Sequence, residues 1–128
     1  HIGLTPQSIK QLGGYKIQGN NDKEYQKILD DAVAVEQAGS FAVVLECVPE
    51  ELAKKITNTL SIPTIGIGAG VHCDAQILVI SDLLGLTSKS IPSFAKSYVN
   101  LYSTISESIQ EFKKDVKNNV FPADKNSF

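Results

Sequence analysis

The sequence of 128 residues contains no methionine, no tryptophan and no arginine, and it has only two cysteines. Because all 12 basic residues are lysines, no planar guanidinium is available to clamp a phosphate or a carboxylate with two parallel hydrogen bonds. Cys47 and Cys73 cannot build a disulfide framework, and their spacing is not that of a metal site. Sparse cysteine favours a reducing compartment, so we expect a cytoplasmic protein.

A formal net charge of −2 excludes a strong attraction to nucleic acid or to an anionic membrane. No apolar run reaches the length needed to cross a bilayer, so we expect neither nucleic acid nor a membrane as a partner. Hydrophobic residues make up 42% and charged residues 20%, which excludes a disordered chain and a coiled coil. The absence of methionine means that residue 1 is not a translation start. We therefore expect the chain to be a piece of a longer polypeptide.

Helical periodicity and β-branched apolar runs alternate along the chain. The spacing of apolar residues predicts helices over 22–38 and 49–60. A third and longer helix, over 94–116, carries an apolar stripe that is expected to be core or a subunit contact. Asn21 and Glu24 resemble a capping box at the start of the first helix.

Strands are predicted over 41–46, 62–68 and 76–80, with a possible fourth over 1–4. Buried strands that alternate with helices indicate a parallel sheet with helical crossovers. A closed (βα)8 TIM barrel needs eight such units and about 250 residues. The fold class predicted is therefore α/β, with residues 1–128 forming the C-terminal half of one barrel domain whose N-terminal half is absent.

Glu46 is the most informative single residue, because it ends an apolar strand run. Strand alternation puts Ala42 and Val44 on its face, and Phe41, Val43 and Leu45 on the opposite face, toward the helices. Thr64 and Gly66 of the next strand are expected on the face of Ala42 and Val44. In a barrel, Glu46 then points into the mouth at the carboxyl ends of the strands, where catalytic residues lie. A carboxylate between apolar walls has a raised pKa and can act as a general base. The alternative is a glutamate that merely opens the loop or caps the next helix.

Other residues with functional chemistry also stand near strand ends. Gly66 and Gly68 lie in a glycine-rich segment whose backbone N–H groups could approach a ligand, although tight packing at a barrel rim explains them equally well. Residues 72–74 are His-Cys-Asp, which we interpret as a solvated loop rather than a metal site. His1 could face the barrel mouth or serve packing alone. We expect His1, Glu46 and the residues after Gly66 to open onto one cavity.

Six strings, in order and in register, resemble the ketopantoate hydroxymethyltransferase family. They are HIGLTPQ at 1–7, GGYKIQG at 13–19, VLECVP at 44–49, PTIGIGAG at 63–70, CD at 73–74 with QILV at 76–79, and DLLGL at 82–86. The pairs at 121–122 and 127–128 resemble the C-terminus of the family. The resemblance therefore runs along the whole chain.

The resemblance implies a (βα)8 barrel that uses Mg²⁺ and transfers a one-carbon unit from 5,10-methylenetetrahydrofolate to 3-methyl-2-oxobutanoate. The product is ketopantoate, a precursor of pantothenate. The proton acceptor of the family matches Glu46, and a histidine near its active site matches His1, which is expected to contact substrate. The Mg²⁺ ligands of the family fall upstream of residue 1, so no metal ligand is expected in this chain. The family forms homo-oligomers of many subunits.

Two other hypotheses stay open at this point. One is another Mg²⁺-dependent barrel that acts on 2-oxo acids, of the phosphoenolpyruvate mutase or lyase type. The other is a small non-catalytic α/β module, complete in itself, which would need about five strands. If the chain is a half-barrel, residues 1–128 alone are expected to be inactive.

Overall fold

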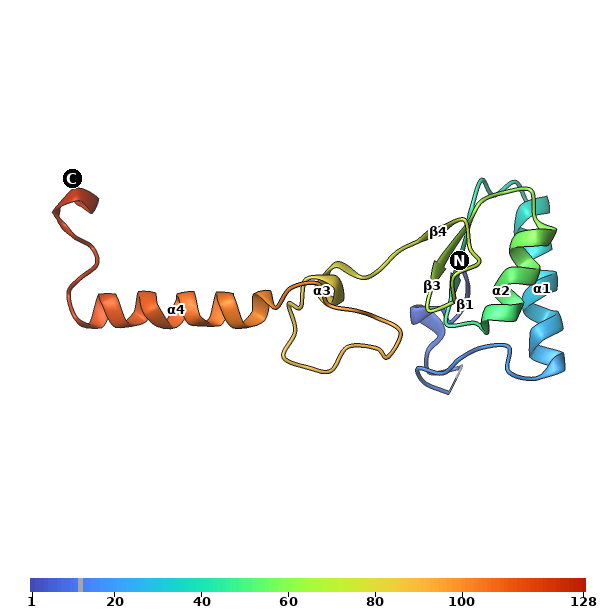
Figure 1. Cartoon of the computed structure of the whole chain (residues 1–128), viewed down its shortest axis with the longest axis horizontal. Coiled ribbons are helices and arrows are strands. Elements are labelled where there is room, and N and C mark those ends of the chain that lie inside the picture. Colours follow the sequence, from blue (N-terminus) through green and yellow to red (C-terminus); the bar gives the residue numbers. More distant parts are fainter. Residues whose placement is uncertain (12) are drawn as a thin grey trace. The chain divides into compact units, whose positions relative to one another are not determined.

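The structure is a computed structural model that describes residues 1–11 and 13–128. The chain divides into two compact units, His1–Leu78 and Val79–Phe128, and each is described by itself (Figure 1). Among the described residues, no helix combines the length and the apolar character needed to span a bilayer.

A parallel sheet of four strands, in the order β1-β2-β3-β4, forms the centre of the first unit (Figure 1). The strands are β1 (Ile2–Gly3), β2 (Val43–Glu46), β3 (Thr64–Ile67) and β4 (Ala75–Gln76). A short 3₁₀ helix, η1 (Pro6–Ser8), follows β1. The predicted α/β class with a parallel sheet is thereby confirmed.

Two helices, α1 (Asp22–Gln37) and α2 (Glu50–Thr59), lie side by side against one face of this sheet (Figure 1). One half of the capping box predicted for α1 is confirmed, because the side chain of Asn21 accepts a hydrogen bond from the N–H of Glu24 at 3.0 Å. The Glu24 carboxylate accepts from the N–H of Gly19 at 3.3 Å. α2 begins one residue after Pro49.

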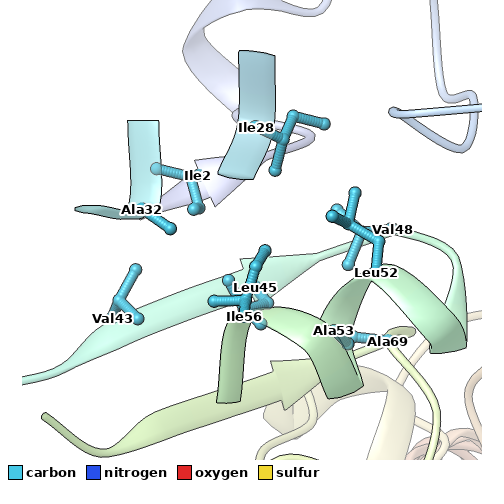
Figure 2. Packing of buried hydrophobic residues seen from close by; sticks show 10 residues of the cluster. All are labelled: Ile2, Ile28, Ala32, Val43, Leu45, Val48, Leu52, Ala53, Ile56 and Ala69. Carbon is cyan, nitrogen blue, oxygen red and sulfur yellow. The ribbon is translucent and has the colours of Figure 1, made fainter. Parts of the chain in front are cut away.

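The hydrophobic core lies between the sheet and the two helices (Figure 2). Val43 and Leu45 of β2 point into it and are almost completely buried, as the strand alternation predicts. Its other members are Ile2, Ile28, Ala32, Val48, Leu52, Ala53, Ile56 and Ala69. The prediction that Phe41 also meets the helices is wrong. β2 begins two residues later, and Phe41 is 91% exposed.

β3 and β4 are joined by only seven residues, 68–74, without a helix. Parallel strands usually need a crossover of a dozen residues or more. The short crossover works because it is pinned back onto the start of β3. The carboxylate of Asp74 accepts hydrogen bonds from the N–H and the hydroxyl of Thr64, at 2.8 and 3.0 Å.

The strand predicted over 76–80 is wrong in extent, because β4 ends at Gln76 and Ile80 begins the short helix α3 (Ile80–Leu83). The helix predicted from residue 94 begins only with α4 (Leu101–Lys117). Asn100 caps α4 at the N–H of Ser103, and the N–H of Tyr98 donates to the carbonyl of Leu83. The N–H of Tyr98 is therefore bonded to the end of α3 and not within a helical turn.

The apolar stripe of α4 is exposed, and no residue of the second unit is buried among those that the structure describes. The exposed residues of this stripe are Ile105, Ile109, Phe112 and Val116. The Phe112 ring meets Phe121 edge to face, with 5.6 Å between ring centroids. The unit ends with the 3₁₀ helix η2 (Asp124–Asn126). Within this unit the stripe is not core.

Candidate functional site

Glu46 is held at the carboxyl end of β2 by both neighbouring strands. Its carbonyl oxygen accepts a hydrogen bond from the N–H of Leu4 at 2.8 Å, and the next N–H, of Cys47, donates to Ile67 at 2.9 Å. Gly3 lies directly opposite Glu46 in the register. Gly3 has a φ of +86°, and a Cβ there would collide with the carbonyl oxygen of Glu46. The close approach of β1 to β2 at this point therefore requires glycine.

The side chains of His1 and Glu46 form a direct contact across this strand pair. The Nε2 of His1 lies 3.0 Å from the Oε2 of Glu46, and the two side chains are 35% and 15% exposed. Burial raises the pKa of the Glu46 carboxyl. A partly buried carboxylate with a raised pKa at the carboxyl end of a parallel strand is suited to accept a proton. The structure thus brings together two of the residues that the sequence places at one end of the sheet, and it adds a direct contact between them.

Cys47, the residue after the carboxylate, has a φ of +49°, which is rare for a residue with a side chain. Its carbonyl accepts a hydrogen bond from the N–H of Gln18 at 2.8 Å, which ties the loop after β1 to the end of β2. Burial, and secondarily the charge of Glu46, raises the pKa of the Cys47 thiol. Burial also raises the pKa of Cys73. Neither thiol has the lowered pKa that marks a nucleophile.

Close packing explains much of the glycine-rich segment. A Cβ on Gly66 would lie 3.0 Å from the Sγ of Cys73, which crosses over it, and the Gly66 carbonyl already accepts the N–H of Ile77 at 3.0 Å. Gly70, with a φ of +75°, packs directly against the side chain of Glu50. Gly68, with a φ of +64°, lies one residue beyond β3. Backbone contacts from Gly66 and Gly68 to a ligand stay a prediction.

The register places Thr64 and Gly66 opposite Val43 and Leu45, so they share the helix-facing side of the sheet. The assumption that Thr64 and Gly66 line the same face as Val44 is therefore wrong. β3 begins two residues later than the predicted strand, and its side chains were assigned to faces without knowledge of the register. Thr64 is completely buried, and its hydroxyl lies 2.8 Å from that of Thr57 in α2.

Residues 72–74, interpreted as a solvated loop, are partly anchored. Asp74 is clamped to Thr64, and these hydrogen bonds lower the pKa of its carboxyl. The Nε2 of His72 lies 3.3 Å from the Oε1 of Glu50 at the start of α2. Sequence analysis missed both contacts. The sequence offered one signal for them. The connection between β3 and β4 is so short that it needs side-chain contacts to hold it in place.

A cavity of about 500 Å³ opens beside His1. Its lining includes His1, Gly3, Thr5 and Gln18, together with the Glu24 side of α1. Of His1, Glu46 and the residues after Gly66, which were expected to share one cavity, only His1 lines this one. Glu46 lies instead on the sheet face of Val44 and Ile65, both of which are half-buried.

Known proteins resemble the chain along its whole length. The family model described as ketopantoate hydroxymethyltransferase matches residues 1–124. Relatives named 3-methyl-2-oxobutanoate hydroxymethyltransferase are 56% identical in Carboxydothermus hydrogenoformans, 55% in Geobacter sulfurreducens and 51% in Syntrophus aciditrophicus. Each match covers 100% of this chain but 46%, 48% and 47% of the relative, respectively. The chain thus spans about half the length of the curated relatives it matches.

Proposed function

Because the chain belongs to the ketopantoate hydroxymethyltransferase family, we propose that it supplies half of a 3-methyl-2-oxobutanoate hydroxymethyltransferase, including its proton acceptor, Glu46. The contact between Glu46 and His1 at the carboxyl end of the sheet is the observation that carries the proposal. The names of the relatives favour this function over a phosphoenolpyruvate mutase or lyase and over a non-catalytic module.

The 128 residues form the C-terminal half of a (βα)8 barrel in this proposal. The four parallel strands, with α1 and α2 on one face only, have the arrangement of a barrel wall. The half-buried face with Val44 and Ile65 is then the barrel interior, and the other half-barrel covers it. The resemblance of residues 121–122 and 127–128 to the end of the family supports the C-terminal assignment.

The chemistry assigned to Glu46 follows from the substrate. The hydrogen on C3 of 3-methyl-2-oxobutanoate is acidic because the adjacent ketone delocalises the carbanion as an enolate. Glu46 takes this proton, and the enolate carbon forms a bond to the one-carbon unit. Burial raises the pKa of Glu46, so it is a stronger base than a carboxylate in water. The raised pKa lies closer to the pH at which the enzyme works.

5,10-Methylenetetrahydrofolate is the one-carbon donor in this proposal, and with water it yields the hydroxymethyl group and tetrahydrofolate. The described residues do not form a complete Mg²⁺ site by themselves. Among them, no group of three His, Cys, Asp or Glu side chains could hold a metal ion, and one oxygen of Glu46 faces His1. In this proposal, Mg²⁺ ligands are supplied by the other half of the enzyme.

The proposal extends to the setting of the enzyme. We place it in the cytoplasm with small molecules as its substrates and a homo-oligomer of many subunits as its assembly. The low cysteine count is consistent with a reducing compartment.

The test uses the complete protein, meaning these 128 residues together with the additional half found in the relatives. Glu46→Gln keeps the size of the side chain and removes the base, so tetrahydrofolate release should fall about a hundredfold or more. Glu51→Gln, an exposed carboxylate on α2, is the matched control and should keep normal turnover. Binding of the ketoacid should change little in either variant. Normal turnover by Glu46→Gln would contradict the proposal.

A further inference from the structure

We propose that His1 is a positioning residue, which orients the carboxylate of Glu46 and stabilises its charged form. This inference rests on the proposed role of Glu46 as proton acceptor. The Nε2–Oε2 distance of 3.0 Å is that of a hydrogen bond between an imidazole N–H and a carboxylate. The sequence had suggested a contact with substrate for His1, and the structure offers a partner within the protein instead.

The backbone brings the two side chains onto one face of the sheet. The register pairs Ile2 with Leu45 and Gly3 with Glu46, and Ile2 and Leu45 both point into the core. Alternation continued back from β1 therefore puts His1, the residue just before this strand, on the same face as Glu46. Gly3, between them, has no side chain, so nothing on β1 separates the imidazole from the carboxylate. The Leu4–Glu46 backbone hydrogen bond fixes the distance between the strands at this point.

The contact with His1 gives the two carboxylate oxygens of Glu46 different roles. His1 occupies Oε2, which leaves Oε1 for the proton of the ketoacid. A hydrogen bond to the charged form of a carboxylate lowers its pKa, whereas burial raises it. His1 thus limits the effect of burial and keeps Glu46 ionised, and therefore able to accept a proton, at lower pH.

Two titratable groups of the described residues interact with Glu46. His1, just before β1, contacts its carboxylate, and the thiol of Cys47, just after β2, feels its charge. The neighbour on β3, Ile67, is apolar. Because burial raises the pKa of Cys47, the thiol stays neutral and protonated. His1 is thus the group whose loss should change the ionisation of Glu46.

The variants separate positioning from substrate binding. His1→Phe keeps a ring and removes the N–H donor. His1→Gln keeps an amide N–H at about the reach of Nε2, whereas the shorter His1→Asn places its amide near the position of Nδ1, too far from Oε2. Measured in the complete enzyme, kcat and KM for the ketoacid and the pH profile of kcat give the answer. The rate of deuterium exchange at C3 reports on the proton acceptor alone.

Positioning predicts that His1→Phe and His1→Asn lower kcat and C3 exchange about ten- to a hundredfold, with KM for the ketoacid nearly unchanged. The acidic limb of the pH profile should move to higher pH, because the charged form of Glu46 has lost its donor. His1→Gln should restore much of the rate and return the limb toward its original position. In a Glu46→Gln background, His1→Phe should cost almost nothing more, because residues that act as a unit are not additive.

The two proposals can fail separately. If Glu46→Gln loses C3 exchange while both His1→Phe and His1→Asn keep normal kcat and an unmoved acidic limb, His1 is not a positioning residue and the function of Glu46 stands. A rise in KM alone would likewise overturn positioning and return His1 to substrate binding. If Glu46→Gln keeps normal exchange, the proposed function fails first. His1→Gln and His1→Asn, both polar and similar in size, keep the comparison valid if His1→Phe does not fold.

Discussion

Both units of the molecule contain amphipathic helices, but the apolar faces of these helices are buried in the first unit and exposed in the second. In His1–Leu78, the apolar faces of α1 and α2 close over the sheet and bury residues such as Leu52 and Ile56 completely. In Val79–Phe128, α4 carries an equally regular stripe whose residues remain exposed. An apolar stripe shows that a helix needs a partner, but it does not say whether the same stretch of chain supplies that partner.

The largest effect is expected from testing the chain without its other half. Residues 1–128 alone should show no hydroxymethyl transfer and should self-associate, because neither the sheet face of Glu46 nor the stripe of α4 is covered within its own unit. Co-expression with the other half should restore tetrahydrofolate release and a single assembled species in sedimentation. A monomeric, cooperatively folding fragment with normal turnover would contradict the half-barrel account.

Alanine substitutions in the two apolar faces sharpen the comparison. Leu52→Ala removes a completely buried side chain and should lower the free energy of unfolding of the complete protein by about 2–5 kcal/mol. Ile109→Ala, on the α4 stripe, should cost a similar amount in the complete protein if the other half covers the stripe. Urea denaturation followed by circular dichroism measures both. A cost below about 0.5 kcal/mol for Ile109→Ala would show that the stripe stays exposed.

The anchor of the short crossover should contribute less. Thr64→Val keeps the shape of the side chain but leaves Thr57 and Asp74 without their shared hydroxyl partner, and should cost about 1–3 kcal/mol of stability. Thr59→Val is the matched control. Its hydroxyl is exposed and bonds only within α2, so its effect should stay within about 0.5 kcal/mol. An equal loss of stability in the two variants would show that the hydrogen bonds of Thr64 do not anchor the crossover.

The smallest effect concerns pH. Hydrogen bonds lower the pKa of Asp74 below its ordinary 3.8 and that of Glu36, which accepts from Ser61, below its ordinary 4.5. A lowered pKa contributes stability above the ordinary value, and this contribution is lost as the pH falls through the lowered value. Glu46 has the opposite sign, so its contribution falls as the pH rises through its raised pKa. Between pH 5 and 2, stability should fall less steeply in Asp74→Asn than in the parent protein.

Local rules predicted the first unit well. The capping side chain of Asn21, the core-facing Val43 and Leu45, and the position of Glu46 at a strand end all follow from alternation and capping, which neighbouring residues determine.

The errors arose where tertiary contacts override the local pattern. Thr64 faces the helices because of its register with Val43, which no single strand reveals. α4 starts at Leu101 because the backbone before Asn100 bonds to the end of α3. The sequence placed His1 and Glu46 near each other but could not predict their direct contact, since that contact needs both the register of β1 with β2 and the space left by Gly3.

The exchange of the C3 proton of 3-methyl-2-oxobutanoate in deuterated water, without any folate, tests the central claim most directly. It isolates the step assigned to Glu46 from one-carbon transfer and from product release. The complete enzyme should catalyse the exchange, and Glu46→Gln should slow it about a hundredfold or more while the ketoacid still binds. Exchange at the normal rate in Glu46→Gln would show that another group accepts the proton.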